Sequence, residues 1–196
     1  MKKVLIFGLS SLYAGVEALI LNYVNHLDEN EYAVDLVVTE RKPEYLDDKL
    51  LRNVDIRIVP NRVRNYVAYV KSMDKIVKTG GYDIIWANFC TLTDIQVLKS
   101  AQKYDVPIRI AHSHNSENMG SFLVMATHLM NKKKLFSMRI NFMHVQILQV
   151  SLCLAGRSLN QKITKLFLMQ LKRLNIDLHR KSENRLEKRC NSVTRL

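Results

Sequence analysis

Strand-like and helix-like segments alternate over the first 131 residues, and this order leaves few folds open. Short apolar or β-branched runs, typical of buried strands, are separated by segments whose apolar residues recur at helical spacing. The predicted strands cover residues 4–8, 32–39, 54–59, 83–87 and 106–111, and the predicted helices cover residues 15–28, 63–77 and 92–104. Strands that alternate with helices over short connections form a parallel sheet covered by helices. We therefore predict an α/β fold with a Rossmann-like parallel sheet.

The composition of the chain changes at the lysine run of residues 132–134. Residues 1–131 contain 15 Lys+Arg and 15 Asp+Glu, whereas the remaining residues contain the other 15 Lys+Arg and only three acidic residues. The formal net charge of +12 therefore comes from the last third of the chain. We divide the chain into a Rossmann-like domain over residues 1–134 and a basic tail over residues 135–196, which we expect to be helical or poorly ordered.

Cysteine spacing and hydropathy restrict where the protein resides. The three cysteines are widely spaced, which excludes a disulfide framework and a CxxC zinc site and indicates a reducing compartment. The apolar run after Lys2 and Lys3 stops at Gly8, so it is expected to be a buried strand rather than a signal peptide. The chain contains no stretch of 18 apolar residues, so we expect no membrane span. We expect a cytoplasmic protein, with peripheral association at the inner face of the membrane as a further hypothesis.

Three loops are expected to form the ligand site. In a parallel sheet of this kind, ligands bind beyond the carboxyl ends of the strands. The loops predicted to lie there are residues 8–15, 88–91 and 112–118, and the third is the densest polar cluster of the chain. We expect the three loops to converge on one face of the domain.

Several features in these loops have structural explanations. Gly8 and Gly15 are not spaced as GxGxxG, and the chain contains neither a GxSxG motif nor a Walker loop. Glu17 in the first turn of a helix interacts favourably with the helix dipole, which alone could explain it. Cys90 follows a predicted strand without a positioned base, so we interpret it as structural.

Two histidines stand at the end of the strand predicted over residues 106–111. We expect the side chains of His112 and His114 to point to opposite sides, which makes them poor ligands for one metal ion. One alternative is a histidine that packs or caps, and the other is a histidine that faces the cleft and forms hydrogen bonds. We expect neither a metal ion nor a cofactor.

Three segments resemble bacterial glycosyltransferases that build capsular polysaccharides and exopolysaccharides. Residues 14–23 (AGVEALILNY) resemble the Gly-Gly-Val-Glu helix start of this family, residues 82–88 (YDIIWAN) resemble its YDIIHAN strand, and residues 109–116 (RIAHSHNS) resemble its IAHSHNS strand and loop. Ala14 replaces the first glycine of the pair, and Trp86 stands where His is common. The family is glycosyltransferase family 4-like: retaining, metal-independent enzymes with the two-domain GT-B fold and nucleotide-sugar donors. The resemblance covers about residues 1–134, which correspond to the acceptor-binding half.

The resemblance implies roles for individual residues. His114 would be the catalytic residue that hydrogen-bonds and orients the transferred sugar. Gly15 and Val16 would bring the backbone close to the donor, and Glu17 would order the helix start. The other residues expected to bind substrate are Asn88, His112, Asn115 and Ser116. The resemblance implies a nucleotide sugar and a glycan or lipid-linked acceptor as substrates. Catalysis would rest on positioning and on charge stabilisation, with the leaving diphosphate held by basic residues of a second domain.

The tail admits two interpretations. In the first, it is a frameshifted continuation of the family. When the last base of each codon is joined to the first two bases of the next, the codons of residues 142–146 can encode Tyr-Ala-Cys-Ser and those of residues 168–171 can encode Asn-Ala-Ile. Both sequences occur in the family in this order. The chain would then be an incomplete glycosyltransferase that is inactive alone for lack of the donor domain. In the second, the tail is the basic amphipathic helix of a non-catalytic binding protein and contacts an anionic membrane or RNA. Its few aromatic residues do not favour specific nucleic-acid recognition.

Overall fold

The structure, a computed structural model, describes residues 1–50, 54–114, 121–138 and 141–144. These residues belong to one compact unit, Met1–Cys153. A second unit, Leu154–Leu196, lies outside the described residues. The two interpretations of the tail rest on residues 145–196 for the most part, so they stay predictions.

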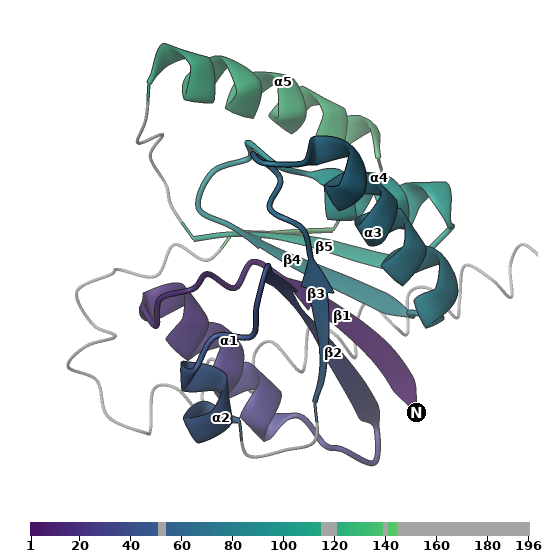
Figure 1. The fold of residues 1–196 in the computed structure, drawn as a ribbon. Coiled ribbons are helices and arrows are strands. Elements are labelled where there is room, and N and C mark those ends of the chain that lie inside the picture. Colours follow the sequence, from purple (N-terminus) through teal and green to yellow (C-terminus); the bar gives the residue numbers. More distant parts are fainter. Residues whose placement is uncertain (51–53, 115–120, 139–140, 145–196) are drawn as a thin grey trace, which may run out of the picture. The chain divides into compact units, whose positions relative to one another are not determined.

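Six parallel strands form one sheet in the order β3-β2-β1-β4-β5-β6 (Figure 1). The predicted parallel α/β sheet is therefore confirmed. The order reverses between β1 and β4, and in such sheets the ligand crevice opens beyond the carboxyl ends of the strands at this switch point. The strands are β1 (Lys2–Phe7), β2 (Tyr32–Thr39), β3 (Asp55–Val59), β4 (Ile84–Phe89), β5 (Ile108–Ser113) and β6 (Asn141–His144).

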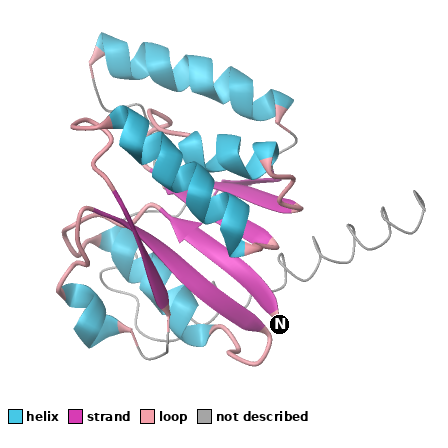
Figure 2. Cartoon of the chain, turned by 45° about the vertical axis from the view of Figure 1, so that its right-hand side comes forward, coloured by secondary structure: helices cyan, strands magenta, loops and turns pink. Residues whose placement is uncertain are grey.

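Helices cover both faces of the sheet, as Figures 1 and 2 show. One face carries α1 (Gly15–His26) and the short α2 (Tyr45–Lys49). The other face carries α3 (Tyr66–Gly80), α4 (Gln96–Lys103) and α5 (Phe122–Ser137). None of the helices in the described ranges is long and apolar enough to cross a membrane.

Side-chain alternation along the strands builds a core on each face. Leu5 is fully buried in the cluster that includes the buried residues of α3 and α4. Its neighbours Val4 and Ile6 are also buried, and because successive strand residues point to opposite faces they pack on the side of α1. The central strand β4 is buried along its whole length. The sheet is therefore a rigid layer that fixes where its strand ends lie.

Three described elements were not predicted from the sequence: α2, α5 and β6. β6 lies within the segment assigned to the basic tail and pairs in parallel with β5, with Ile110 opposite Asn141. The helix predicted over residues 63–77 begins later, at Tyr66, because the Asn65 side chain accepts a hydrogen bond from the amide of Ala68 at 2.9 Å and caps it.

Candidate functional site

The loops that follow β1, β4 and β5 meet at the switch point of the sheet. Gly8 directly follows β1 and has a φ of +121°. A Cβ atom at this position would lie 2.5 Å from the backbone oxygen of Asn88 in β4. Because both the backbone conformation and the space exclude a side chain, only glycine allows these two strand ends to approach so closely.

The carboxylate of Glu17 ties the loop after β1 to the first turn of α1. Glu17 is buried, its Oε1 accepts a hydrogen bond from the amide of Ser10 at 3.0 Å, and its Oε2 accepts one from the amide of Ala14 at 3.1 Å. Hydrogen bonds from backbone amides to a carboxylate are strong, and a negative charge near a helix N-terminus is stabilised by the helix dipole. The loop therefore has a defined shape.

The outer side of the loop after β1 is apolar and packs against α2. The Tyr45 hydroxyl donates a hydrogen bond to the backbone oxygen of Ser10 at 2.8 Å, and its ring lies 5.5 Å from the ring of Tyr13. The Lys49 ammonium lies 5.4 Å from the centroid of the Tyr13 ring. Leu12 and Tyr13 are 76% and 48% exposed. The loop thus presents an apolar and aromatic rim to solvent.

His114 is held by β4 at the end of β5. Its backbone amide donates to the oxygen of Phe89 at 2.9 Å, and its Nε2 lies 2.8 Å from Oδ1 of Asn88. The Asn88 amide nitrogen donates to the backbone oxygen of Phe7 at 3.2 Å, so its Oδ1 faces His114. Because that oxygen can only accept, Nε2 of His114 carries the proton and Nδ1 remains an acceptor.

A column of aromatic rings lies below His114 on the side of α1. The ring centroids of His112 and His114 are 4.3 Å apart, Trp86 stacks on His112 at 5.8 Å, and Tyr23 meets Trp86 edge-on at 5.4 Å. Burial against this column lowers the pKa of His114 to about 4, although the negative charge of Glu17 opposes the shift. His114 is therefore neutral at pH 7.

The expectation that the two histidines point to opposite sides was wrong. Residues two apart on a strand share a face, and β5 extends through Ser113, so the His112 ring lies beside that of His114. His112 is fully buried and packs between Trp86 and His114. Within the described ranges, no group of three His, Cys, Asp or Glu side chains is placed to hold a metal ion.

The remaining predicted site residues fall into three groups. Gly15 is exposed at the first position of α1, where a Cβ atom would meet no described residue within 4 Å, and Val16 is partly buried beside it. Asn88 lies inside β4 rather than in the loop after it, and it is buried. Asn115 and Ser116 lie outside the described residues.

Cys90 is exposed but is not an activated nucleophile. Partial burial of its thiol raises its pKa, and the nearby negative charge of Glu17 raises it further. Since the thiolate is the reactive form, a raised pKa keeps this side chain a protonated thiol at neutral pH.

The loop after β4 is fixed by side chains that sequence reasoning missed. Nδ1 of His128 in α5 accepts a hydrogen bond from the amide of Leu92 at 3.2 Å, and Nδ2 of Asn131 donates to the oxygen of Leu92 at 2.6 Å. From α3, the Tyr69 hydroxyl donates to Asp94 at 2.6 Å. His128 and Asn131 are three residues apart and so share one face of α5, which is the only sequence signal for this contact.

A scan against protein-family models finds no match to this sequence, and no curated protein matches it significantly. The functional proposal therefore depends on the geometry of this site and on the three resembling segments.

Proposed function

We propose that residues 1–134 form the acceptor-side half of a retaining GT-B glycosyltransferase of the capsular or exopolysaccharide type. The enzyme transfers a sugar from a nucleotide sugar to a polysaccharide or lipid-linked acceptor. One observation carries the proposal: the three resembling segments, far apart in the sequence, contribute Glu17, Asn88 and His114 to one place at the switch point. This is where sheets with this strand order bind ligands.

In this proposal His114 positions the sugar and does not transfer a proton. Its pKa of about 4 keeps the ring neutral, and its Nε2 proton is directed at Asn88. The Nδ1 atom is left to accept a hydrogen bond from a hydroxyl group of the transferred sugar. A neutral ring also adds no positive charge beside an oxocarbenium-like transition state, which a cation would destabilise.

Gly15 supports close approach of the donor to α1. The described part of the fold gives no reason for a glycine there, because a Cβ atom would meet no atom of the described residues within 4 Å. A helix N-terminus has unpaired backbone amides and a partial positive charge, which favour the phosphates of a nucleotide sugar. Without a side chain at Gly15, these amides are accessible to a bound donor.

The exposed rim formed by Leu12 and Tyr13 is proposed to meet the acceptor. Aromatic rings supply flat apolar surfaces with low conformational entropy, and the Tyr13 ring is already supported by Tyr45 and Lys49. The leaving diphosphate, by the same resemblance, is held by a second domain. Association with the inner face of the membrane remains a prediction of the same proposal.

The test is donor binding followed residue by residue. The ¹⁵N-labelled chain is titrated with a UDP-sugar and a GDP-sugar, and backbone amide shifts are recorded by NMR. We expect shifts confined to residues 8–17, 88–91 and 112–114, and weaker binding in His114→Ala. The matched control is His26→Ala, which removes an exposed histidine at the other end of α1 and leaves binding unchanged. Absence of shifts in these segments, or equal weakening in both variants, contradicts the proposal.

A further inference from the structure

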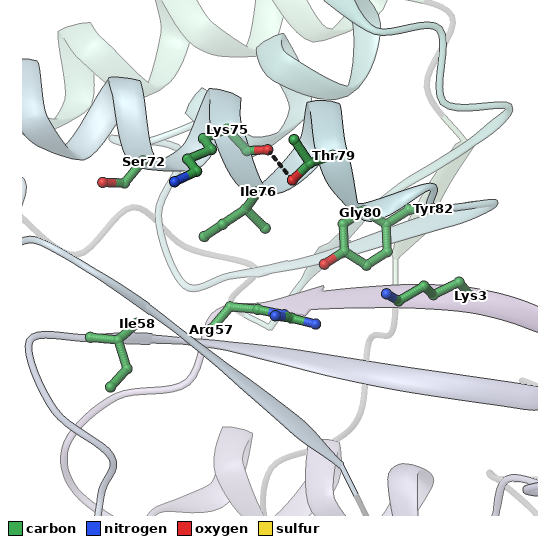
Figure 3. Close-up of a pocket in the computed structure, with 9 residues that line it drawn as sticks. All are labelled: Lys3, Arg57, Ile58, Ser72, Lys75, Ile76, Thr79, Gly80 and Tyr82. Carbon is green, nitrogen blue, oxygen red and sulfur yellow. Dashed lines mark hydrogen bonds between the residues drawn. The ribbon is translucent and has the colours of Figure 1, made fainter.

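A cavity of about 380 Å³ lies between α3 and the sheet (Figure 3). It is lined by Lys3, near the start of β1, and by Tyr82, which precedes β4. Glu17 and His114 lie instead beyond the carboxyl ends of the strands. The cavity is therefore separate from the proposed glycosyltransferase site, and nothing in that function requires it.

Every charged side chain that lines this cavity within the described part of the chain is a cation. Lys3 comes from β1, Arg57 from β3 and Lys75 from α3. Three positive charges on the wall of one cavity repel each other, so a bound anion would stabilise them.

A buried carboxylate behind the wall neutralises part of this charge. Asp35 in β2 is 2% exposed, and its Oδ2 accepts hydrogen bonds from Nε of Arg57 at 2.7 Å and from the Tyr82 hydroxyl at 2.6 Å. Arg57 also pairs with Asp55 at 2.9 Å. Figure 3 shows the side chains of Lys3, Arg57 and Tyr82 pointing toward one another from the sheet. The guanidinium is thus a structural cation with two carboxylate partners.

Lys75 keeps its donors for a ligand, whereas Lys3 is already engaged. The Lys3 ammonium forms an ion pair with the buried carboxylate of Asp35 at 3.7 Å and lies 5.2 Å from the centroid of the Tyr82 ring. No ion pair or hydrogen bond to a described residue engages the Lys75 ammonium or the Ser72 hydroxyl, which α3 places one turn apart. Thr79 donates its hydroxyl proton to the backbone oxygen of Lys75 and so offers only lone pairs.

We propose that this cavity binds a small phosphomonoester. The phosphate group is held by the Lys75 ammonium and the Ser72 hydroxyl, which lie toward the same end of the cavity in Figure 3, and the organic part packs against Ile76. Ammonium groups bind phosphate as point charges and hydroxyl groups add hydrogen bonds. A volume of 380 Å³ lies at the lower end of the range for small-molecule sites, which is about 300–1,000 Å³.

The experiment follows the backbone amides of residues 72–82 in the ¹⁵N-labelled full chain. Inorganic phosphate and glycerol 3-phosphate are titrated as probes. Acetate is titrated in parallel to compare the binding of a simple carboxylate with that of a phosphate. We expect saturable shifts of Ser72, Thr79 and Gly80 with both phosphates, and weaker binding of acetate. Amide shifts are specific to the site, so phosphate bound elsewhere on this basic chain does not contribute to them.

Two α3 variants of equal charge decide whether the cavity or net charge is responsible. Both lysines are exposed, but Lys75→Ala removes one that lines the cavity and Lys78→Ala removes one of the same helix that does not. We expect Lys75→Ala to weaken phosphate binding by about tenfold or more, as loss of one charge-assisted contact does, and Lys78→Ala to leave it unchanged. Absence of saturation in the wild-type chain, equal weakening in both variants, or tighter binding of acetate than of phosphate overturns the proposal.

Discussion

Nε2 of His114 lies 2.8 Å from Oδ1 of Asn88, and the Asn88 amide nitrogen donates to the backbone oxygen of Phe7. One buried amide side chain thus connects the ends of β1, β4 and β5. It orients the histidine ring, determines which ring nitrogen carries the proton, and does so without a charged group. The arrangement resembles the support that carboxylates give to functional histidines elsewhere, but it does not favour the protonated ring.

Chain stability is expected to fall at acid pH partly because of His114. Its pKa is lowered from the ordinary value of 6.5 to about 4, so the unfolded state binds the proton more tightly. The neutral ring contributes fully to the free energy of unfolding above about pH 6.5. This contribution, which is up to about 3 kcal/mol, is lost as the pH falls through about 4. The measurement is urea denaturation between pH 4 and 7. The free energy of unfolding of His114→Gln should depend less on pH than that of the wild type. An NMR titration that places the pKa of His114 near 6.5 would contradict this prediction.

Two glycines of the same loop should respond oppositely to alanine. Gly8→Ala places a Cβ atom 2.5 Å from Asn88 and forces alanine into a φ of +121°, so we expect a loss of at least about 2 kcal/mol in the free energy of unfolding. Gly15→Ala meets no neighbouring atom and should stabilise the helix start by about 0.4–1 kcal/mol.

Chemical denaturation of both variants checks these stability changes, and the NMR titration adds a functional readout for the second. If donor phosphates approach the α1 amides, Gly15→Ala should weaken nucleotide-sugar binding while leaving the fold at least as stable. A destabilised Gly15→Ala chain, or a Gly8→Ala chain of wild-type stability, would show that the loop geometry is wrong.

The Tyr82 hydroxyl is expected to contribute to stability, unlike that of a tyrosine on the surface of α3. Tyr82→Phe removes a 2.6 Å hydrogen bond to the buried carboxylate of Asp35, and loss of a bond to a charged group costs about 1.5–3 kcal/mol. Tyr66→Phe is the matched control, because Tyr66 is 55% exposed and should change stability by less than about 0.5 kcal/mol. Thermal unfolding of both variants at neutral pH separates them, and equal stabilities would argue against the buried network.

Much of the sheet could be predicted because its strands are buried and lie between clear helical patterns. The segment of residues 32–39 was predicted with the bounds that β2 has. α5 was missed because apolar residues occur on its exposed side, such as Phe122 and Met130, as well as on its buried side, such as Leu135, so no single stripe stands out. β6 has four residues and needs β5 as a partner, which local sequence does not encode.

The site was predicted in outline because strand ends can be located in a sequence. Its details depend on which strands are neighbours. The contact between Asn88 and His114 requires β4 beside β5, and the contact between Asp35 and Arg57 requires β2 beside β3. The contact between Asp35 and Tyr82 requires the reversal of strand order at β1, which brings β4 to the other side of β1 from β2. A charged residue, Asp35, in an otherwise apolar strand was the available sequence signal for the buried network of Asp35, Arg57 and Tyr82. The sequence alone does not show which residues pair with it.

The proposed function predicts that the 196-residue chain alone transfers no sugar. In the described residues, a sugar donor can contact the helix start at Gly15 and the neutral ring of His114. The resemblance implies that a second domain makes the contacts with the leaving diphosphate. Each electrostatic contact missing in a transition state costs about 10²–10³ in rate, so loss of several abolishes measurable turnover. We therefore expect no transfer from labelled UDP-sugars or GDP-sugars to lipid-linked acceptors, together with weak donor binding at the loops after β1, β4 and β5. Product formation well above that of a His114→Ala chain would mean that this chain itself supplies the diphosphate contacts, and the assignment of residues 135–196 to a non-native tail would then be wrong.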